Sequence, residues 1–383
     1  MNTSGNRYSM SPIHLFYVLY VSLVNVGLMN FQYKMLHGAE NDGWISILIA
    51  SVIVAVVIKM MYVLLGRQSA KQSTLVHINQ RYWGKYAGSI INWIFILYFV
   101  LGSIVAFLSY VHIVQLWILP TQNIRIISLV VLVLLYYCVA GGIQSVTGMC
   151  LWGTLFILLL VFPQIFLVSS YLHPRNLLPI MDHEASTILL STRDMLHEFI
   201  GCGILLVVYP FIRTPERSVR WAYAAVVTAT VVYLVFFTFS FMFFSHGQMK
   251  EHLWPTLSLI SIIEMPLIQR MEYLVLSFWL LKMLAIIALG LWAACHCLKL
   301  ETSIRPSMGL KMAMVLFVIL IMVIRNSTQI EMMTEVYMRS GEVLIFIYLP
   351  LLFLVSLFRI NRGQFPQPTR EIPNRTTVKG DEK

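Results

Sequence analysis

The sequence predicts an all-α protein that crosses a membrane many times. Of its 383 residues, 58% are hydrophobic and only 11% are charged, whereas a soluble domain carries about 25% charged residues. The mean hydropathy is +0.78. Residues 86–124 and 126–174 contain no Asp, Glu, Lys or Arg, and each stretch is long enough for at least one bilayer crossing. These observations exclude a disulfide-rich secreted scaffold, a disordered chain and a coiled coil.

Ten transmembrane helices account for the apolar stretches. Pro120 ends the third span, and Gly141-Gly142 separates the fourth from the fifth. The ninth span is the shortest. The predicted spans form one transmembrane domain over residues 1–358 and cover about 11–35, 43–65, 88–118, 124–140, 146–172, 195–212, 221–245, 272–297, 310–324 and 341–358.

The distribution of basic residues predicts the orientation. With ten spans and the N-terminus inside, about two thirds of the 27 Lys and Arg residues lie in inner segments, as the positive-inside rule requires. Both termini are therefore expected in the cytoplasm. The net charge of +10 reflects this rule, so nucleic-acid binding is not expected. The basic tail at 359–383 is expected to contact anionic lipid.

Two predicted spans contain helix-weakening residues near their middles. The first span has Asn25-Val26-Gly27, and the sixth has Gly201-Cys202-Gly203. Interrupted helices at matching positions of two five-span halves indicate an inverted-repeat transporter site at the bilayer midplane. Unwound backbone offers free N–H and C=O groups to a ligand. The alternative is that small residues only allow close helix packing.

The third span adds Tyr98 and Gly102, which are one helical turn apart and share a face. They either line a small-ligand pocket or pack in the core, with the tyrosine hydroxyl on a backbone carbonyl. The candidate ligand-binding residues are Asn25, Gly27, Tyr98, Gly102, Gly201, Cys202, Gly203 and Lys282.

Four ionisable residues lie within or at the ends of apolar stretches. Glu198, Glu272 and Glu342 are near outer ends, so we expect them at the membrane interface. Lys282 is ten residues into the eighth span and so lies near mid-membrane. A lysine at this depth must pair across helices, face a wet cavity or lose its proton.

Signatures of catalysis are missing from the sequence. It has no phosphate-binding glycine loop, no HExxH and no GxSxG, and its ten histidines are scattered. Cys295-His296-Cys297 is the one metal-like cluster, but positions i and i+2 do not share a helix face, so packing is the expected role. We therefore expect no enzyme, no cofactor and no metal.

Short motifs in the loops resemble those of the spore germination B subunits of germinant receptors, a branch of the amino acid–polyamine–organocation transporter superfamily. The resemblance covers nearly the whole chain and depends on the order and spacing of the motifs. They are Asn41-Asp42-Gly43-Trp44-Ile45-Ser46, Trp83-Gly84-Lys85-Tyr86-Ala87-Gly88, Leu119-Pro120-Thr121 with Gly142-Ile143, Asn176-Leu177-Leu178-Pro179, and Pro266-Leu267-Ile268-Gln269-Arg270-Met271-Glu272.

Some positions depart from the family pattern. Gln144 and Gly148 stand where an acid and an arginine are expected, and Gln269 replaces an acid. These departures leave the fold unaffected and bear on which ligand the protein takes.

The resemblance implies a five-plus-five inverted repeat of the LeuT type with broken spans 1 and 6. It also implies a ligand-sensing subunit of a germinant receptor in the spore inner membrane. The ligand would be a small nutrient such as an amino acid, and the partners would be a membrane A subunit and a lipoprotein C subunit. The alternatives are a proton-coupled amino-acid transporter, with Lys282 or Glu198 in the proton path, and a structural subunit without a ligand.

The resemblance also suggests a hypothesis for Lys282. In related transporter folds a cation beside spans 1 and 8 helps to hold the site closed. The ammonium of Lys282 has three donors, and the carbonyls near Asn25–Gly27 are expected to lack partners. Lys282 is therefore expected to act as a built-in cation that bridges span 8 to these carbonyls.

Overall fold

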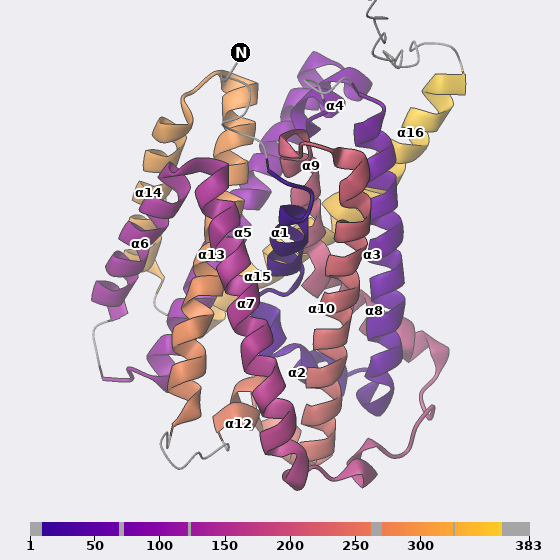
Figure 1. Cartoon of the computed structure of the whole chain (residues 1–383), viewed down its shortest axis with the longest axis vertical. Coiled ribbons are helices and arrows are strands. Elements are labelled where there is room, and N and C mark those ends of the chain that lie inside the picture. The colour runs from indigo at the N-terminus through magenta and orange to yellow at the C-terminus, as the bar shows by residue number, and fades with distance from the viewer. Residues whose placement is uncertain (1–9, 69–72, 122–123, 262–269, 325, 362–383) are drawn as a thin grey trace, which may run out of the picture.

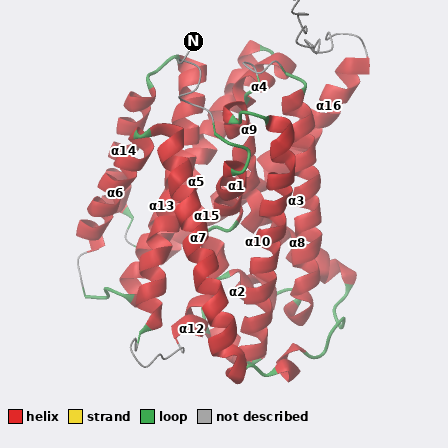
Figure 2. Ribbon diagram, viewed as in Figure 1, coloured by secondary structure: helices red, strands yellow, loops and turns green. Residues whose placement is uncertain are grey.

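The computed structural model describes residues 10–68, 73–121, 124–261, 270–324 and 326–361, and over these residues the chain is helical without strands (Figures 1 and 2). Gln269 and most of the basic tail (362–383) lie outside the described residues. The long helices are α3 (Gly43–Gly66), α5 (Lys85–Trp117), α6 (Ile124–Ala140), α7 (Gly142–Val168), α10 (Pro215–Phe243), α13 (Met271–Thr302), α14 (Pro306–Val323), α15 (Ser327–Gly341) and α16 (Leu349–Asn361).

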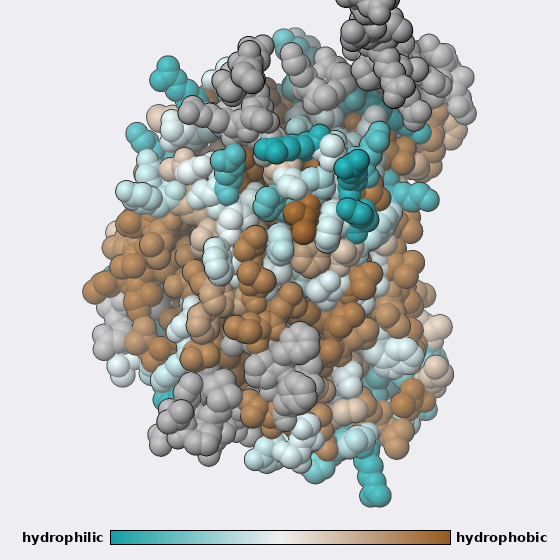
Figure 3. All heavy atoms as spheres, viewed as in Figure 1, coloured by the Kyte–Doolittle hydropathy of each residue, from teal (hydrophilic) through white to brown (hydrophobic). Residues whose placement is uncertain are grey.

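Eight helices in the described part of the chain are long and apolar enough to cross a membrane. Two shorter apolar helices, at His14–Leu23 and Arg125–Ala140, coincide with the first and fourth predicted spans. On the face shown in Figure 3, apolar side chains form a broad band across the middle, and polar side chains lie towards the ends, most of them near the upper one. The chain is therefore a multi-pass membrane protein, and the full count of ten spans remains a prediction.

The first and sixth predicted spans are both interrupted helices. The first consists of α1 (His14–Leu23), the 3₁₀-helix η2 (Val26–Met29) and α2 (Phe31–Leu36). The other consists of α8 (Ala185–Phe199), the 3₁₀-helix η6 (Ile200–Ile204) and α9 (Leu205–Val208). In each case the residues flagged in the sequence lie at the start of the 3₁₀ segment or within it.

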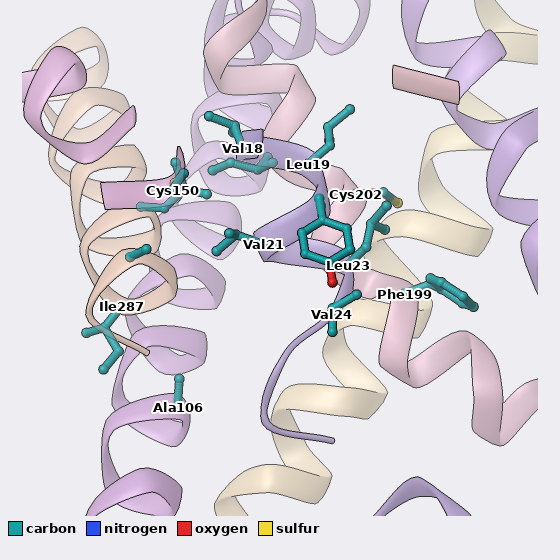
Figure 4. Packing of buried hydrophobic residues seen from close by; sticks show 14 of the residues in the cluster. Val18, Leu19, Val21, Leu23, Val24, Ala106, Cys150, Phe199, Cys202 and Ile287 are labelled. Atoms are coloured by element: carbon teal, nitrogen blue, oxygen red, sulfur yellow. The ribbon is translucent and has the colours of Figure 1, made fainter. Parts of the chain in front are cut away.

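The helix α1 lies in the centre of the bundle, where it packs mainly against α10 and α7 (Figure 1). Val18 and Val21 of α1, and Val24 directly after it, are fully buried among apolar side chains of several helices, including Cys150 and Phe199 (Figure 4). Around this centre α13 packs against α5 and α7, and α3 packs against α8. The first interrupted helix is thus enclosed by the continuous helices α7 and α10 and by the second interrupted helix. Unwound backbone is tolerated in a membrane where other helices enclose it in this way.

Several helices begin earlier than the sequence predicts. The helix α8 starts at Ala185 rather than near 195, and α15 starts at Ser327 and continues through the π-helical segment η8 (Glu342–Tyr348) into α16. Their first turns are polar, so hydropathy alone assigns them to loops. Asn326 and Gln329 form a capping box that starts α15.

The motif that precedes α3 anchors a distant loop. The carboxylate of Asp42 is fully buried and accepts hydrogen bonds from the backbone N–H groups of Met181, Asp182 and His183, at 2.6, 3.0 and 3.2 Å. Ser46 Oγ donates to the carbonyl of Ile188, at 3.0 Å. The motif residues therefore fix α3 to the loop that leads into α8.

Candidate ligand-binding site

A cavity of about 680 Å³ lies between the two interrupted helices. This is within the range of small-molecule sites, about 300–1,000 Å³. Its walls come from η2, α2, α5, α8, η6, α13 and α15. Five of the residues predicted from the sequence line it: Asn25, Gly27, Tyr98, Gly102 and Gly201.

The interruption of the first span is shaped by the side chain of Asn25. Its Oδ1 accepts a hydrogen bond from the backbone N–H of Gly27, at 2.7 Å, and its Nδ2 donates to the carbonyl of Glu198, at 3.2 Å. Two backbone carbonyls beside the break already have partners. Tyr233 Oη donates to Leu23 O at 3.1 Å, and Thr256 Oγ1 donates to Leu28 O at 2.8 Å.

Tyr98 combines the two roles that the sequence left open. It lines the cavity, and its hydroxyl donates to the carbonyl of Ile200, at 3.3 Å, at the start of η6. Its ring stacks on Tyr337, with ring centroids 5.1 Å apart. A methyl group at Gly102 would lie 2.6 Å from the same Tyr337 ring. Gly102 therefore leaves room for an aromatic pair that closes one side of the cavity.

The expectation that Glu198 lies at the membrane interface is wrong. Its side chain is fully buried, and Glu198 Oε1 lies 2.8 Å from Lys34 Nζ of α2. Glu198 Oε2 has no hydrogen-bond partner among the described residues. The helix α8 begins about ten residues earlier than predicted and ends at Phe199, so Glu198 lies in its last turn, beside both interruptions.

The other two glutamates are paired with exposed arginines, and their position at the membrane interface stays a prediction. The Glu272 side chain is only 6% exposed, and its Oε1 accepts from Arg270 Nε at 2.8 Å. Glu342 is bound by Arg193, at 2.8 and 3.0 Å, and by His197 at 3.0 Å. Both oxygens of Glu342 and one oxygen of Glu272 are bound by basic side chains, whereas Glu272 Oε2 has no hydrogen-bond partner among the described residues.

Cys202, Gly203 and Lys282 are absent from the cavity lining. Cys202 is fully buried beside α1 (Figure 4). A methyl group at Gly203 would meet Ile345 of η8 at 2.5 Å. These two residues pack the interrupted helix against its neighbours, which is the alternative that the sequence left open for the small residues.

The bridging hypothesis for Lys282 is also wrong in its geometry. Lys282 Nζ is fully buried and, among the described residues, has no hydrogen-bond partner, so it reaches no carbonyl of Asn25–Gly27. It lies 4.4 Å from the centre of the Trp279 ring. Its backbone packs closely against Gly153 of α7. Carbonyls beside the break are bound by hydroxyl groups instead, so a cation is not needed there.

Three residues of the site were missed by the sequence analysis. The sequence does not single out Lys34, at the end of the first predicted span, or Tyr337, which lies between the ninth and tenth predicted spans. Glu198 was noticed as a costly charge in an apolar stretch, but its partner was not. The spacing of Asn30 and Lys34, one helical turn apart beyond the break, is the signal that could have placed Lys34 on the cavity side.

Comparison with known proteins decides the family. The family model described as spore germination protein matches residues 9–330. Spore germination protein GerQB of Bacillus cereus is 30% identical over 354 residues, which are 92% of this chain and 97% of that protein. The chain belongs to the spore germination protein family. Spore germination protein B2 of Bacillus subtilis (strain 168) is 24% identical over 281 residues, 72% of this chain and 74% of that protein.

Solved structures show where this family stands among folds. The chain resembles a Na⁺-coupled sialic acid symporter in a substrate-bound outward-open state, with a TM-score of 0.64 and 12% identity over 89% of this chain and 80% of the symporter. It also resembles MhsT in complex with L-phenylalanine, with a TM-score of 0.53 and 13% identity over 91% of this chain and 89% of MhsT. At these identities the likeness shows the fold alone. The spore germination family member is therefore an all-α protein of the LeuT fold.

Gly27 provides the first prediction. A methyl group at this position would lie 1.5 Å from Glu198 Oε2 and 2.6 Å from Oε1. Gly27→Ala should therefore push the carboxylate away from Lys34 and lower the free energy of unfolding by about 2 kcal/mol. Thermal unfolding of the purified protein in detergent measures this change.

The double variant Gly27→Ala/Glu198→Ala is the control for this prediction. It should lose less stability than the sum of the two single variants, because the methyl group then has nothing to displace. Simple additivity would contradict the assigned contact.

Proposed function

We propose that this family member is the nutrient-sensing integral membrane subunit of a spore germinant receptor. In this proposal a small amino-acid-like germinant binds in the cavity between the two interrupted helices. The observation that carries it is the composition of the cavity wall. The wall combines unwound backbone at Gly27 and Gly201, an aromatic pair and Lys34, whose ion-pair partner Glu198 is buried behind it. Such a mixture suits a small molecule with polar and apolar parts.

A continuous helical segment runs from the cavity to a second polar cluster of the molecule. Tyr337 lines the cavity, and its helix α15 continues through η8 into α16. At the end of η8, Tyr348 Oη donates to Asn79 Oδ1 at 2.7 Å, and Asn79 Nδ2 donates to Asn92 Oδ1 at 2.8 Å. This arrangement supports a receptor, because a shift of α15 on binding would reach a second, buried polar cluster.

Localisation and partners follow from the same proposal. The protein would lie in the spore inner membrane, with both termini in the cytoplasm. It would act with a membrane A subunit and a lipoprotein C subunit, and its tail at 359–383 would contact anionic lipid. The polar cluster around Asn79 would then face the cytoplasmic side, where a signal to partners is useful.

Ligand binding tests the proposal directly. The full-length protein is purified in detergent, and its thermal unfolding is measured with each of the twenty L-amino acids in turn. At about 100 times the dissociation constant, a bound ligand should add about 2.7 kcal/mol to the free energy of unfolding. We expect one or a few amino acids to stabilise the protein, and the same ones to trigger germination of spores that carry it as their sole receptor.

Uptake separates this function from the second candidate, a proton-coupled amino-acid transporter, which the likeness to symporters favours. Labelled amino acid is offered to proteoliposomes with and without a proton gradient. Binding without accumulation supports the receptor, and gradient-driven accumulation supports the transporter. If no amino acid stabilises the protein, the nutrient-sensing proposal is wrong.

A further inference from the structure

The ion pair between Lys34 and Glu198 joins the two interrupted helices. Lys34 belongs to α2, beyond the first interruption, and Glu198 belongs to α8, just before the second. Lys34 Nζ and Glu198 Oε1 are 2.8 Å apart, with the lysine side chain 26% exposed and the glutamate side chain fully buried. Lys34 lines the cavity. The pair therefore has one member that a ligand can reach directly.

The carboxylate of Glu198 fills the space beside the unwound turn. Its Oε2 lies where the side chain of residue 27 would begin, 1.5 Å from an ideal Cβ position. This oxygen has no hydrogen-bond partner among the described residues, although it is buried. A buried carboxylate oxygen without a donor is costly. The site thus holds a buried acceptor that lacks a donor among the described residues and lies beside the cavity wall at Gly27.

The charged or ionisable residues that line the cavity besides Lys34 include Arg193, Asp194, His197, Glu331, Glu335 and Arg339. Both oxygens of Glu342 are occupied by Arg193 and His197. Arg339 and Glu335 form a pair one helical turn apart on α15, with side chains 70% and 61% exposed. None of the carboxylates of Asp194, Glu331, Glu335 and Glu342 has a buried oxygen without a hydrogen-bond partner, whereas Glu198 does. A ligand ammonium therefore gains most by binding Glu198.

We propose that the ligand of this site is a zwitterion that inserts into the Lys34–Glu198 pair. The ligand ammonium binds the Glu198 carboxylate, including Oε2, and the ligand carboxylate binds the Lys34 ammonium. One buried ion pair is then replaced by two, and no charge is left without a partner. The inference rests on the proposed function. It adds that Glu198 binds the positive charge of the ligand and Lys34 binds its negative charge.

The same balance predicts which compounds are rejected. An amine without a carboxylate would pair with Glu198 and leave Lys34 alone, and an acid without an amine would do the reverse. Each leaves one buried or half-buried charge unpaired. The ion pair joins the two interrupted helices directly. A ligand inserted between Lys34 and Glu198 therefore also changes the contact between these helices.

The test uses matched compounds on the full-length protein in detergent. The probes are L-leucine, 3-methylbutylamine and 4-methylpentanoate, with the corresponding set for any other amino acid that stabilises the protein. Affinity is measured by isothermal titration and by thermal unfolding. For the wild type we expect the zwitterion to bind at least about tenfold more tightly than either singly charged compound.

Two variants then separate the roles. Lys34→Met should remove the requirement for the carboxylate, so that the amine binds as tightly as the amino acid. Glu198→Gln should remove the requirement for the ammonium and leave the acid as the preferred compound. The matched controls are Lys59→Met and Glu251→Gln, which remove one exposed charge each outside the cavity and should change every affinity less than about twofold.

The outcomes distinguish this inference from the proposed function. If amino acids bind the wild type and both variants keep its order of preference, the inference is overturned and the nutrient-sensing function stands. If no amino acid binds the wild type, the function itself fails. Should either variant fail to fold, the wild-type comparison decides, since equal binding of a singly charged compound overturns the inference by itself.

Discussion

Gly201→Ala is expected to destabilise the protein more than any other single methyl addition in the two interruptions. An ideal Cβ at this position lies 1.9 Å from the carbonyl oxygen of Ser22 and 2.6 Å from its carbon. The obstacle is backbone, which cannot rotate away as a side chain can. The two interrupted helices would have to separate, and overpacking of this kind costs about 3 kcal/mol or more.

Membrane yield and thermal unfolding in detergent measure the effect. Gly148→Ala is the matched control, because a methyl group there meets nothing within 4 Å, and alanine favours the interior of α7 by up to about 1 kcal/mol. It should be neutral or slightly stabilising. Wild-type stability of Gly201→Ala would mean that the crossing at Ser22 is not close in the membrane.

Composition and local pattern predict the fold well, because a bilayer imposes its own rules on a sequence. The charge-free stretches and the small residues at Gly27 and Gly201 suffice to place the two interruptions in matching spans. A side chain at position 201 would collide with the backbone of Ser22 on the first interrupted helix. This close approach of the two helices, more than the backbone flexibility of glycine, explains the glycine at this position. Sequence patterns indicate small residues at such crossings but give no distance.

The site is harder to predict, because its charges come from segments that look like loop or interface. Lys34 and Glu198 are separated by most of one half of the protein, and only the crossing of the two broken helices brings them within 2.8 Å. Hydropathy assigns Tyr337 to a loop, since the first turns of α15 are polar. The polar turns of α15 line the cavity. No local sequence pattern distinguishes such polar helical turns from a loop.

Lys282→Met is expected to stabilise the protein, by about 3 kcal/mol. The side chain is fully buried, and its Nζ has no hydrogen-bond partner among the described residues. The ring of Trp279, 4.4 Å away, offers only partial compensation. Replacing an uncompensated buried polar group with an apolar one of similar length usually stabilises a protein, and a thioether keeps a favourable contact with the indole ring.

Thermal unfolding in detergent and in liposomes measures this gain, and Lys59→Met is the control. Lys59 is on α3 and its side chain is exposed, so its replacement should change the free energy of unfolding by less than about 0.5 kcal/mol. If the nutrient response falls while stability rises, Lys282 is retained for function at a cost in stability. A clear loss of stability in Lys282→Met would instead show that Nζ has a partner in the folded protein, and would restore a bridging role for this lysine.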